Sequence, residues 1–510
     1  MKETWSKIEI KYKICFFSAL IIGLFTHAYI FYNKISFHDD VMLIGAGSTF
    51  SSGRWMLGIV HAIIKKVIGS ESIPAFIGPI SLILLGMTGV LLVKIYEIES
   101  SKICALIGAL LVVFPSIAGL YGYMFTSWYY CFGILLAVLA VFLCNKINNL
   151  FWGIGISAFV IACSVGIYQA YISITVSSFI LLFILQIYNT ENDIVMLIKK
   201  AISYATTIII GLLEYLIINK VFLALLHISM TDYKNLNNMG KISLKTLCTG
   251  IKEAYIHFIG GGQNPSLYIG NIKYIYYGVI IFCVCMIVSK LINWIQNKEY
   301  IRSCIWGLTC IMLPLAINFL YLMNVSEMYS LMQYSEIFVF IFVLVLVDRI
   351  KDHIETHKRV VKSVLCLVIV SVAYTIIVYA KYDNLCYLNA QISCRKVDSW
   401  MTALVANIKE CEGYNSEMQI MYVNEGEVKD ITFDAYSPLY MEHIVPYSFV
   451  DLRNEYNWKD YLRVYCGFTM NEVDSNTRNS LINSEEVVNM CSYPNDGSIR
   501  IINGIIVVKF

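Results

Sequence analysis

The sequence predicts a polytopic α-helical membrane protein that ends in a small α+β domain. Of its 510 residues, 58% are hydrophobic and 15% are charged, whereas soluble domains carry about 45–50% apolar and about 25% charged residues. The apolar residues gather in runs of mostly about 18–25 residues, and such runs can cross a hydrocarbon core of about 30 Å. The composition becomes polar after residue 380, so we expect a membrane domain over 1–380 and a second domain over 381–510.

Eleven hydrophobic segments are candidate transmembrane helices. They cover approximately residues 14–32, 73–95, 103–119, 125–144, 150–168, 170–188, 202–226, 272–292, 303–323, 334–347 and 361–380. The first follows a basic start and lacks a small-residue cleavage site, so we interpret it as an uncleaved anchor. Lys and Arg are concentrated in every second connection between the segments, and these connections are cytoplasmic if the N-terminus is cytoplasmic. Cytoplasmic connections of membrane proteins usually carry such an excess. This pattern predicts a plasma-membrane protein with domain 381–510 on the extracytoplasmic side.

Charge and cysteine content exclude several classes of function. A net charge of +2 gives no electrostatic basis for binding nucleic acid. The sixteen cysteines lie mostly inside hydrophobic runs, where cysteine behaves as a small apolar residue. No Cys-x-x-Cys or Cys/His metal spacing occurs. We therefore expect no metal site and no cofactor, apart from a divalent cation that the acid pair described next could hold.

The first outside loop, 33–72, contains an adjacent acid pair, Asp39 and Asp40, preceded by His38. One interpretation is a solvated loop end after the first span. Acids contribute little to topology, however, and adjacent acids repel one another. An aspartate at a membrane surface could instead act as a general base on a sugar hydroxyl, while its neighbour orients the acceptor or holds a cation.

Residues 54–68 of the same loop have the periodicity of a helix lying in the membrane interface. Arg54 at its start could anchor this helix, or it could bind the phosphate of a lipid-linked sugar, since guanidinium forms bidentate bonds to phosphate oxygens. Trp55 could be an interfacial belt residue or a platform on which a sugar stacks. The segment thus joins a cationic and an aromatic side chain near the acid pair.

Further polar side chains gather in predicted outside turns. Candidate substrate contacts, each with an interfacial or structural alternative, are Tyr168, Gln169, Tyr171, Glu327, Tyr329 and Gln333. Glu336 falls at the start of the tenth segment, where an acid is costly unless it faces a polar cavity. For Glu214, inside the seventh segment, we favour a hydrogen-bonded contact between helices. His257, beside the glycine-rich turn 260–262, is interpreted as incidental.

Domain 381–510 has the patterns of a small α+β fold. Residues 383–411 predict a helix and 419–423 a strand. Two further strands, 498–502 and 505–509, flank an Asn-Gly pair that is typical of a tight hairpin turn. The predicted domain would lie outside the membrane, with binding of an acceptor polysaccharide as its possible role.

Several short motifs carry a family resemblance. The segments His38-Asp39-Asp40, Ser52-Gly53-Arg54-Trp55 and 166–171 (Gly-Ile-Tyr-Gln-Ala-Tyr) resemble the serotype-converting glucosyltransferases of bacteria (Gtr type II), within the GT-C class of membrane glycosyltransferases. The tail from Tyr493 to Ser498, with its closing strand, is similar to the ends of long members from Gram-positive species. The resemblance extends over most of the chain.

The resemblance implies a reaction. A polyprenyl-phosphate-linked hexose, typically glucose, would be transferred outside the membrane, with inversion, to a surface polysaccharide or glycolipid. Asp39 or Asp40 would be the base and Arg54 a contact of the donor phosphate. Two alternatives remain: a flippase or exporter of lipid-linked saccharides, and a capsule or O-antigen polymerase. Charged residues inside several spans would favour the flippase, and an arginine-rich outside loop would favour the polymerase. The sequence shows neither feature clearly.

Overall fold

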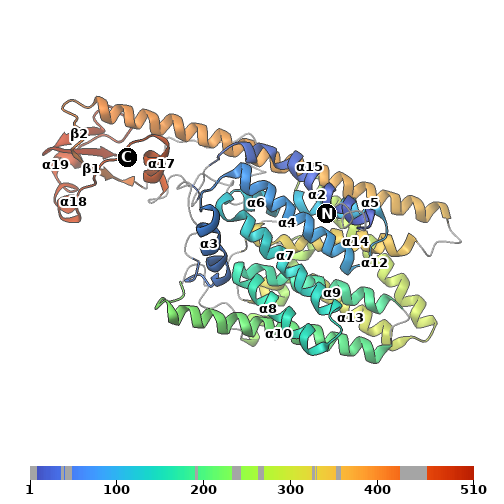
Figure 1. Ribbon diagram of the computed structural model, residues 1–510. Coiled ribbons are helices and arrows are strands. Elements are labelled where there is room, and N and C mark those ends of the chain that lie inside the picture. Colours follow the sequence, from blue (N-terminus) through green and yellow to red (C-terminus); the bar gives the residue numbers. More distant parts are fainter. Residues whose placement is uncertain are drawn as a thin grey trace. The chain divides into compact units, whose positions relative to one another are not determined.

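The computed structural model describes residues 8–35, 40, 49–189, 193–231, 243–261, 269–323, 328, 330–351, 358–425 and 457–510. These residues form two compact units. The first holds the described residues up to Leu385 except Ile35 and Asp40, and the second holds those two with the residues from Cys386 on. The first unit is a bundle of helices, and the second contains a three-stranded sheet (Figure 1).

The helices of the first unit follow the predicted hydrophobic segments closely. They are α2 (Ile10–Tyr32), α3 (Trp55–Ile68), α4 (Pro74–Ile95), α5 (Ser101–Val113), α6 (Pro115–Tyr121), α7 (Met124–Lys146), α8 (Leu150–Ile167), α9 (Ile172–Tyr188), α10 (Ile194–Leu225), α11 (Leu244–Ile256), α12 (Ile272–Gln296), α13 (Tyr300–Ile317), α14 (Phe338–Lys351) and the first part of α15 (Lys358–Glu410). The last span and the following helix, predicted as separate, are one continuous helix.

The predicted count of eleven spans is too high for the described residues. Nine of their helices are long and apolar enough to cross a membrane, or ten if the bent pair α5 and α6 forms one span. Against a count of ten, the difference lies at 334–347, where a 3-10 turn, η8 (Tyr334–Ile337), precedes an α14 of only 14 residues. The apolar composition of this segment is as predicted, but its backbone is not one long helix.

The central helix of the bundle is α9. Of the span that contains it, 89% is buried, against 17% for the most apolar windows of α10 and α12. Helices α2 and α5 pack closely at Gly108, where a Cβ would lie 2.1 Å from the carbonyl oxygen of Cys15. Small residues at helix interfaces permit such close packing in membranes. The buried interior therefore lies around α9, with α10 and α12 at the periphery.

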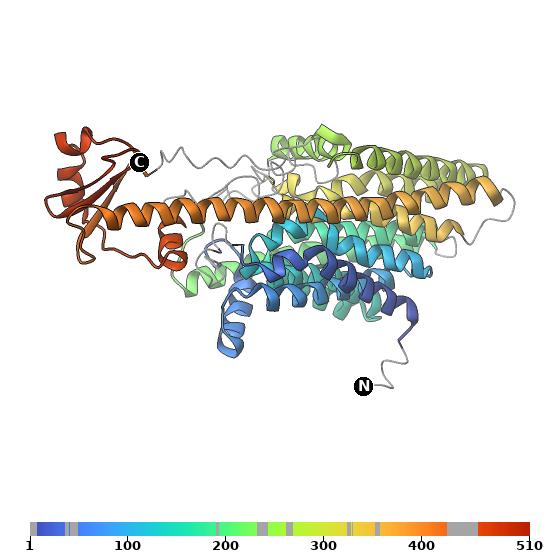
Figure 2. The same cartoon turned by 90° about the horizontal axis from the view of Figure 1, so that it is seen from above.

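The two ends of the bundle have different connections. We call the end at which α2, α8 and α10 finish the α3 end, because α3 lies across it in both views (Figure 1, Figure 2). At the opposite end, where α4, α7, α9 and α14 finish, the buried charged side chains Asp348 and Arg302 are paired. The Asp348 carboxylate accepts from the backbone N–H groups of Glu99 and Ser100 at the start of α5, at 2.9 and 3.0 Å. Arg302 donates to the carbonyls of Ile187 and Asn189 at the end of α9.

The second unit is a small α+β fold built on a sheet with the strand order β1-β3-β2. Strands β2 (Ile499–Ile502) and β3 (Ile505–Lys509) form the predicted hairpin. Its turn residues Asn503 and Gly504 have φ of +51° and +76°, as a type I′ turn requires. Strand β1 (Gln419–Val423) pairs parallel to β3, a pairing that the sequence pattern did not predict.

Helices cover the sheet and complete the core of the second unit. The core combines the last part of α15 with α17 (Asn457–Tyr465) and includes Tyr422, Trp458 and Phe510. Two short helices, α18 (Ser475–Leu481) and α19 (Glu485–Val488), lie beside a second, smaller apolar cluster. This is a complete hydrophobic core made from residues after 396, so the second unit has the internal organisation of a domain.

Candidate functional site

Arg54 follows a tight turn whose backbone is held from two other helices. Gly53 has φ of +74°, and a Cβ at this position would lie 2.7 Å from the Tyr215 hydroxyl. The Gln169 amide nitrogen donates to the carbonyl of Ser52 at 2.7 Å, and the Tyr215 hydroxyl donates to the carbonyl of Gly53 at 3.1 Å. The turn requires glycine, and its buried contacts fix where α3 begins.

The guanidinium of Arg54 is fixed by aromatic side chains. It donates to the Tyr130 hydroxyl at 3.0 Å, and its central carbon lies 5.1 Å from the centre of the Tyr168 ring. Tyr130, Tyr168 and Tyr171 form a compact aromatic group, with ring centres 5.0–6.5 Å apart. A cation over an aromatic face is stabilised by the quadrupole of the ring. Arg54 is therefore a positioned cation at the α3 end.

Two of the predicted sugar contacts make extensive contacts within the protein. Trp55 is 3% exposed, stacks on Phe222 with an interplanar angle of 13°, and lies where any Cβ at Gly166 would meet it. Gln169 uses its amide nitrogen on the Ser52 carbonyl and the Tyr215 hydroxyl. In this structure both side chains hold α3 and its preceding turn in place.

His61 lies on α3 between the aromatic group and the solvent-exposed lysines. Its Nδ1 atom is 3.3 Å from the Tyr129 hydroxyl. Partial burial lowers the pKa of this histidine below its ordinary value, and the nearby Lys65 lowers it further. The neutral form of His61 is therefore favoured when α3 is docked against α7.

The break between α5 and α6 leaves two backbone carbonyls that accept hydrogen bonds from side chains instead of from the helix. The helices meet at an angle of 42° before Pro115, which has no N–H to donate to the Leu111 carbonyl. The Tyr334 hydroxyl donates to that carbonyl at 2.6 Å instead. His27 Nε2 lies 2.8 Å from the next carbonyl, of Val112. The broken helix thus draws two polar side chains to the bundle centre near the α3 end.

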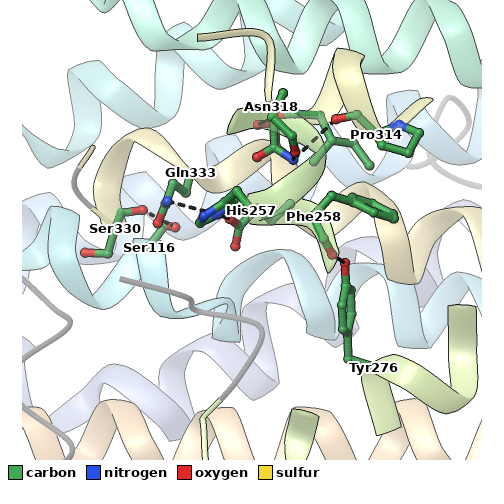
Figure 3. A network of polar contacts seen from close by, with 12 residues as sticks. Ser116, His257, Phe258, Tyr276, Pro314, Asn318, Ser330 and Gln333 are labelled. Atoms are coloured by element: carbon green, nitrogen blue, oxygen red, sulfur yellow. Dashed lines mark hydrogen bonds and ion pairs between the residues drawn. The ribbon is translucent and has the colours of Figure 1, made fainter. Parts of the chain in front are cut away.

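A buried histidine–glutamate pair lies at the same end. His257 Nε2 is 2.6 Å from a carboxylate oxygen of Glu336 and 3.2 Å from the Gln333 amide nitrogen. The exposed fractions of these three side chains are 1–4%. Figure 3 shows His257 facing Gln333, with Ser116 donating to the Ser330 carbonyl beside them. The sequence analysis assigned no role to His257, because its partners are about 80 residues away and a single histidine belongs to no motif of recognisable spacing.

Asp383 is another buried acid at this end, and the sequence analysis did not identify it. It lies on α15, is fully buried, and neither carboxyl oxygen has a hydrogen-bond partner among the described residues. A carboxyl group buried without a partner is unfavourable for folding, which makes a functional role reasonable. Its position just past the predicted last span gave no sign of this burial.

The predicted acid pair is only partly described. Asp40 is 1% exposed, whereas His38, Asp39, Glu327 and Tyr329 lie outside the described residues. Within the described part of the chain, no group of three His, Cys, Asp or Glu side chains could hold a metal ion. A catalytic role for Asp39 and Asp40, and a cation bound between them, therefore stay predictions.

Together, the long apolar helices and the buried polar side chains at one end of the bundle define a membrane protein with an internal polar site. The chain belongs to the glucosyl transferase GtrII family, whose model matches residues 28–346, well over half of its length. It is thus a glycosyltransferase that acts on sugar donor and acceptor substrates, as the sequence resemblance predicted. No curated protein and no solved structure matches the chain. The matched region contains Arg54, the aromatic group and the His257–Glu336 pair.

Proposed function

We propose that this glycosyltransferase moves glucose from a polyprenyl-phosphate donor to a surface polysaccharide or glycolipid on the outer side of the plasma membrane, with inversion. The observation that carries the proposal is the fixed position of the Arg54 guanidinium beside Tyr130 and Tyr168. A positioned guanidinium suits a phosphate, which it binds in a bidentate manner. It also stabilises the charge that develops on the phosphate as the sugar leaves.

In the proposed reaction, a hydroxyl oxygen of the acceptor attacks the anomeric carbon. The bond from that carbon to the phosphate oxygen breaks, and polyprenyl phosphate leaves with the bonding electrons. Asp39 or Asp40 takes the proton of the hydroxyl as general base. Attack from the face opposite the phosphate inverts the anomeric carbon. Glu327 and Tyr329 are further proposed contacts of the substrates.

The proposed orientation has the N-terminus in the cytoplasm and the α3 end outside. It is supported by the Lys and Arg residues of the opposite end, including Lys94, Lys102 and Lys146, since such residues favour the cytoplasmic side. The polyprenyl chain of the donor would then enter from the outer leaflet beside α3. The exposed apolar side chains of Ile63, Val67 and Ile68 on that helix suit contact with lipid.

Steady-state kinetics with synthetic polyprenyl-phosphate glucose test the role of Arg54. Replacing a charged hydrogen-bonding group loses about 1.5–3 kcal/mol, so Arg54→Gln should lower kcat/KM by about 10–150-fold (1.4 kcal/mol for each factor of ten). Arg54→Lys should recover only part, because lysine lacks the planar fork. Lys66→Gln, at an exposed position of the same helix, is the matched control.

Two results would contradict the proposal. One is wild-type kcat/KM in Arg54→Gln. The other is a wild-type enzyme that uses a sugar pyrophosphate lipid or a soluble nucleotide sugar in preference to the lipid monophosphate. Movement of labelled lipid between leaflets without sugar transfer would favour the flippase instead.

A further inference from the structure

The His257–Glu336–Gln333 cluster has buried hydrogen-bonding atoms to which no other described residue bonds. One ring nitrogen, Nε2, faces both partners. The other ring nitrogen, the second carboxylate oxygen of Glu336 and the amide oxygen of Gln333 are buried, and none has a hydrogen-bond partner in the described residues. Three such atoms lie within one cluster of three contacting side chains.

Leaving these atoms unsatisfied is energetically unfavourable. A buried polar group without a partner costs about 1–3 kcal/mol, and more when it is charged. Most buried polar atoms in proteins are therefore hydrogen-bonded, and a buried atom without a partner needs an explanation, such as a ligand that binds there. A ligand that supplies the missing hydrogen bonds would remove this cost when it binds.

The unused atoms select a class of ligand. A carboxylate oxygen and an amide oxygen only accept hydrogen bonds, so they disfavour a phosphate, which consists of acceptors and carries the same sign of charge as Glu336. Sugar hydroxyl groups suit the set, because each can donate to an oxygen and also accept from a neighbouring N–H. The Tyr321 ring, with its centre 5.5 Å from that of His257, adds an aromatic side chain to the cluster.

The position of the cluster also fits a sugar. His257 begins the π-helical turn η4 (His257–Gly261) directly after α11, and Glu336 and Gln333 precede α14. These segments lie at the α3 end. Tyr334, in the same 3-10 turn as Glu336, donates to the Leu111 carbonyl at the break between α5 and α6. The cluster therefore lies at the same end of the bundle as Arg54, the proposed phosphate contact.

We propose that His257, Gln333 and Glu336 form a carbohydrate subsite that binds hydroxyl groups of a sugar ring. This inference rests on the proposed function and adds a second polar site to it. The sugar is either the hexose of the lipid donor or the terminal residue of the acceptor, and both present the same hydroxyl chemistry. His257 and Gln333 position the ring, and the Glu336 carboxylate accepts a hydroxyl proton in a hydrogen bond.

Binding and transfer assays on His257→Gln and Glu336→Gln test this subsite. The control is His227→Gln, which makes the same change as His257→Gln at an exposed histidine. Three quantities are measured with purified protein in proteoliposomes: affinity for bare polyprenyl phosphate, affinity for polyprenyl-phosphate glucose, and transfer to polysaccharide from cells that lack the gene. Affinity for the bare lipid phosphate reports on folding and on the Arg54 region.

A donor subsite predicts that both variants bind bare polyprenyl phosphate normally and bind the glucosylated lipid about tenfold or more weakly. An acceptor subsite predicts normal binding of both lipids with about tenfold or greater loss of transfer. The inference is overturned if all three quantities match the wild type, or if both lipids lose affinity equally, since the cluster then has no role specific to the sugar. Failure of the wild type itself to use the lipid monophosphate would reject the proposed function instead.

Discussion

The two ends of the helical bundle differ in how their buried charged side chains are bonded. At the end opposite α3, Asp348 accepts from two backbone N–H groups, and Arg302 donates to the carbonyls at the end of α9. At the α3 end, Asp383, Glu336 and His257 include buried oxygens and a ring nitrogen that have no hydrogen-bond partner among the described residues. Both ends bury ionisable side chains, but one end pairs them and the other leaves atoms open.

The difference separates structural from functional polarity. Paired groups at helix ends stabilise the fold, because they satisfy backbone groups that the helix itself cannot. Open buried groups reduce stability, and proteins keep them where binding or chemistry requires them. We therefore expect substitutions at the opposite end to change stability and substitutions at the α3 end to change activity.

The largest expected effect is at the acid pair. Loss of a general base lowers the rate by about 10²–10⁴-fold, so either Asp39→Asn or Asp40→Asn should reduce the transfer rate by this factor. Quenched-flow or radiolabel assays of glucose transfer measure it. If both variants keep wild-type kcat while binding donor normally, the acid pair is only a loop end and the catalytic assignment is wrong.

Asp348→Ala should reduce stability and leave activity nearly unchanged. It leaves two N–H groups at the start of α5 without their acceptor, which costs about 1–3 kcal/mol of unfolding free energy, and it should leave kcat within about twofold. Thermal unfolding in detergent and the transfer assay are run on the same preparation. A stable but inactive Asp348→Ala protein would break the proposed division between the two ends.

Asp383→Leu sharpens the comparison, because it removes a buried aspartate at the α3 end. Loss of a buried carboxyl group without a partner should raise the unfolding temperature, since the cost of burying it disappears. We expect transfer activity to fall, because we assign Asp383 a role in the site. Asp348→Leu is the matched control at the opposite end. A destabilised Asp383→Leu protein with full activity would show that Asp383 is structural.

The smallest expected effect concerns pH. The pKa of His61 is lowered in the folded state by partial burial and by Lys65, while the unfolded value is about 6.5. The unfolded state then binds more protons as the pH falls below that value, so docking of α3 weakens toward acidic pH. Protection factors of the α3 amides at pH 7.5 and 5.5, which correct for the intrinsic pH dependence of exchange, measure this, and His61→Asn should make them equal. Equal protection factors of wild-type α3 at both pH values would contradict the prediction.

Local patterns were enough to predict most of the long helices, the Asn503-Gly504 hairpin and the family. Hydrophobic periodicity and turn residues are local properties, and each depends on fewer than about 25 neighbouring residues. The contacts that make the site are not local. The Leu111 carbonyl, freed by Pro115, is taken up by Tyr334, and His257 meets Glu336. Such pairings depend on how the helices pack, which composition and spacing do not specify.

The proposed reaction is tested by transfer from synthetic polyprenyl-phosphate glucose in proteoliposomes, with the anomeric configuration of the product determined by NMR. We predict that wild-type protein transfers glucose with inverted configuration and releases polyprenyl phosphate. Retained configuration would contradict the single displacement. An absence of transfer, with labelled lipid-linked sugar changing leaflets instead, would contradict the account of the α3 end as the active site of a lipid-phosphate-dependent glucosyltransferase.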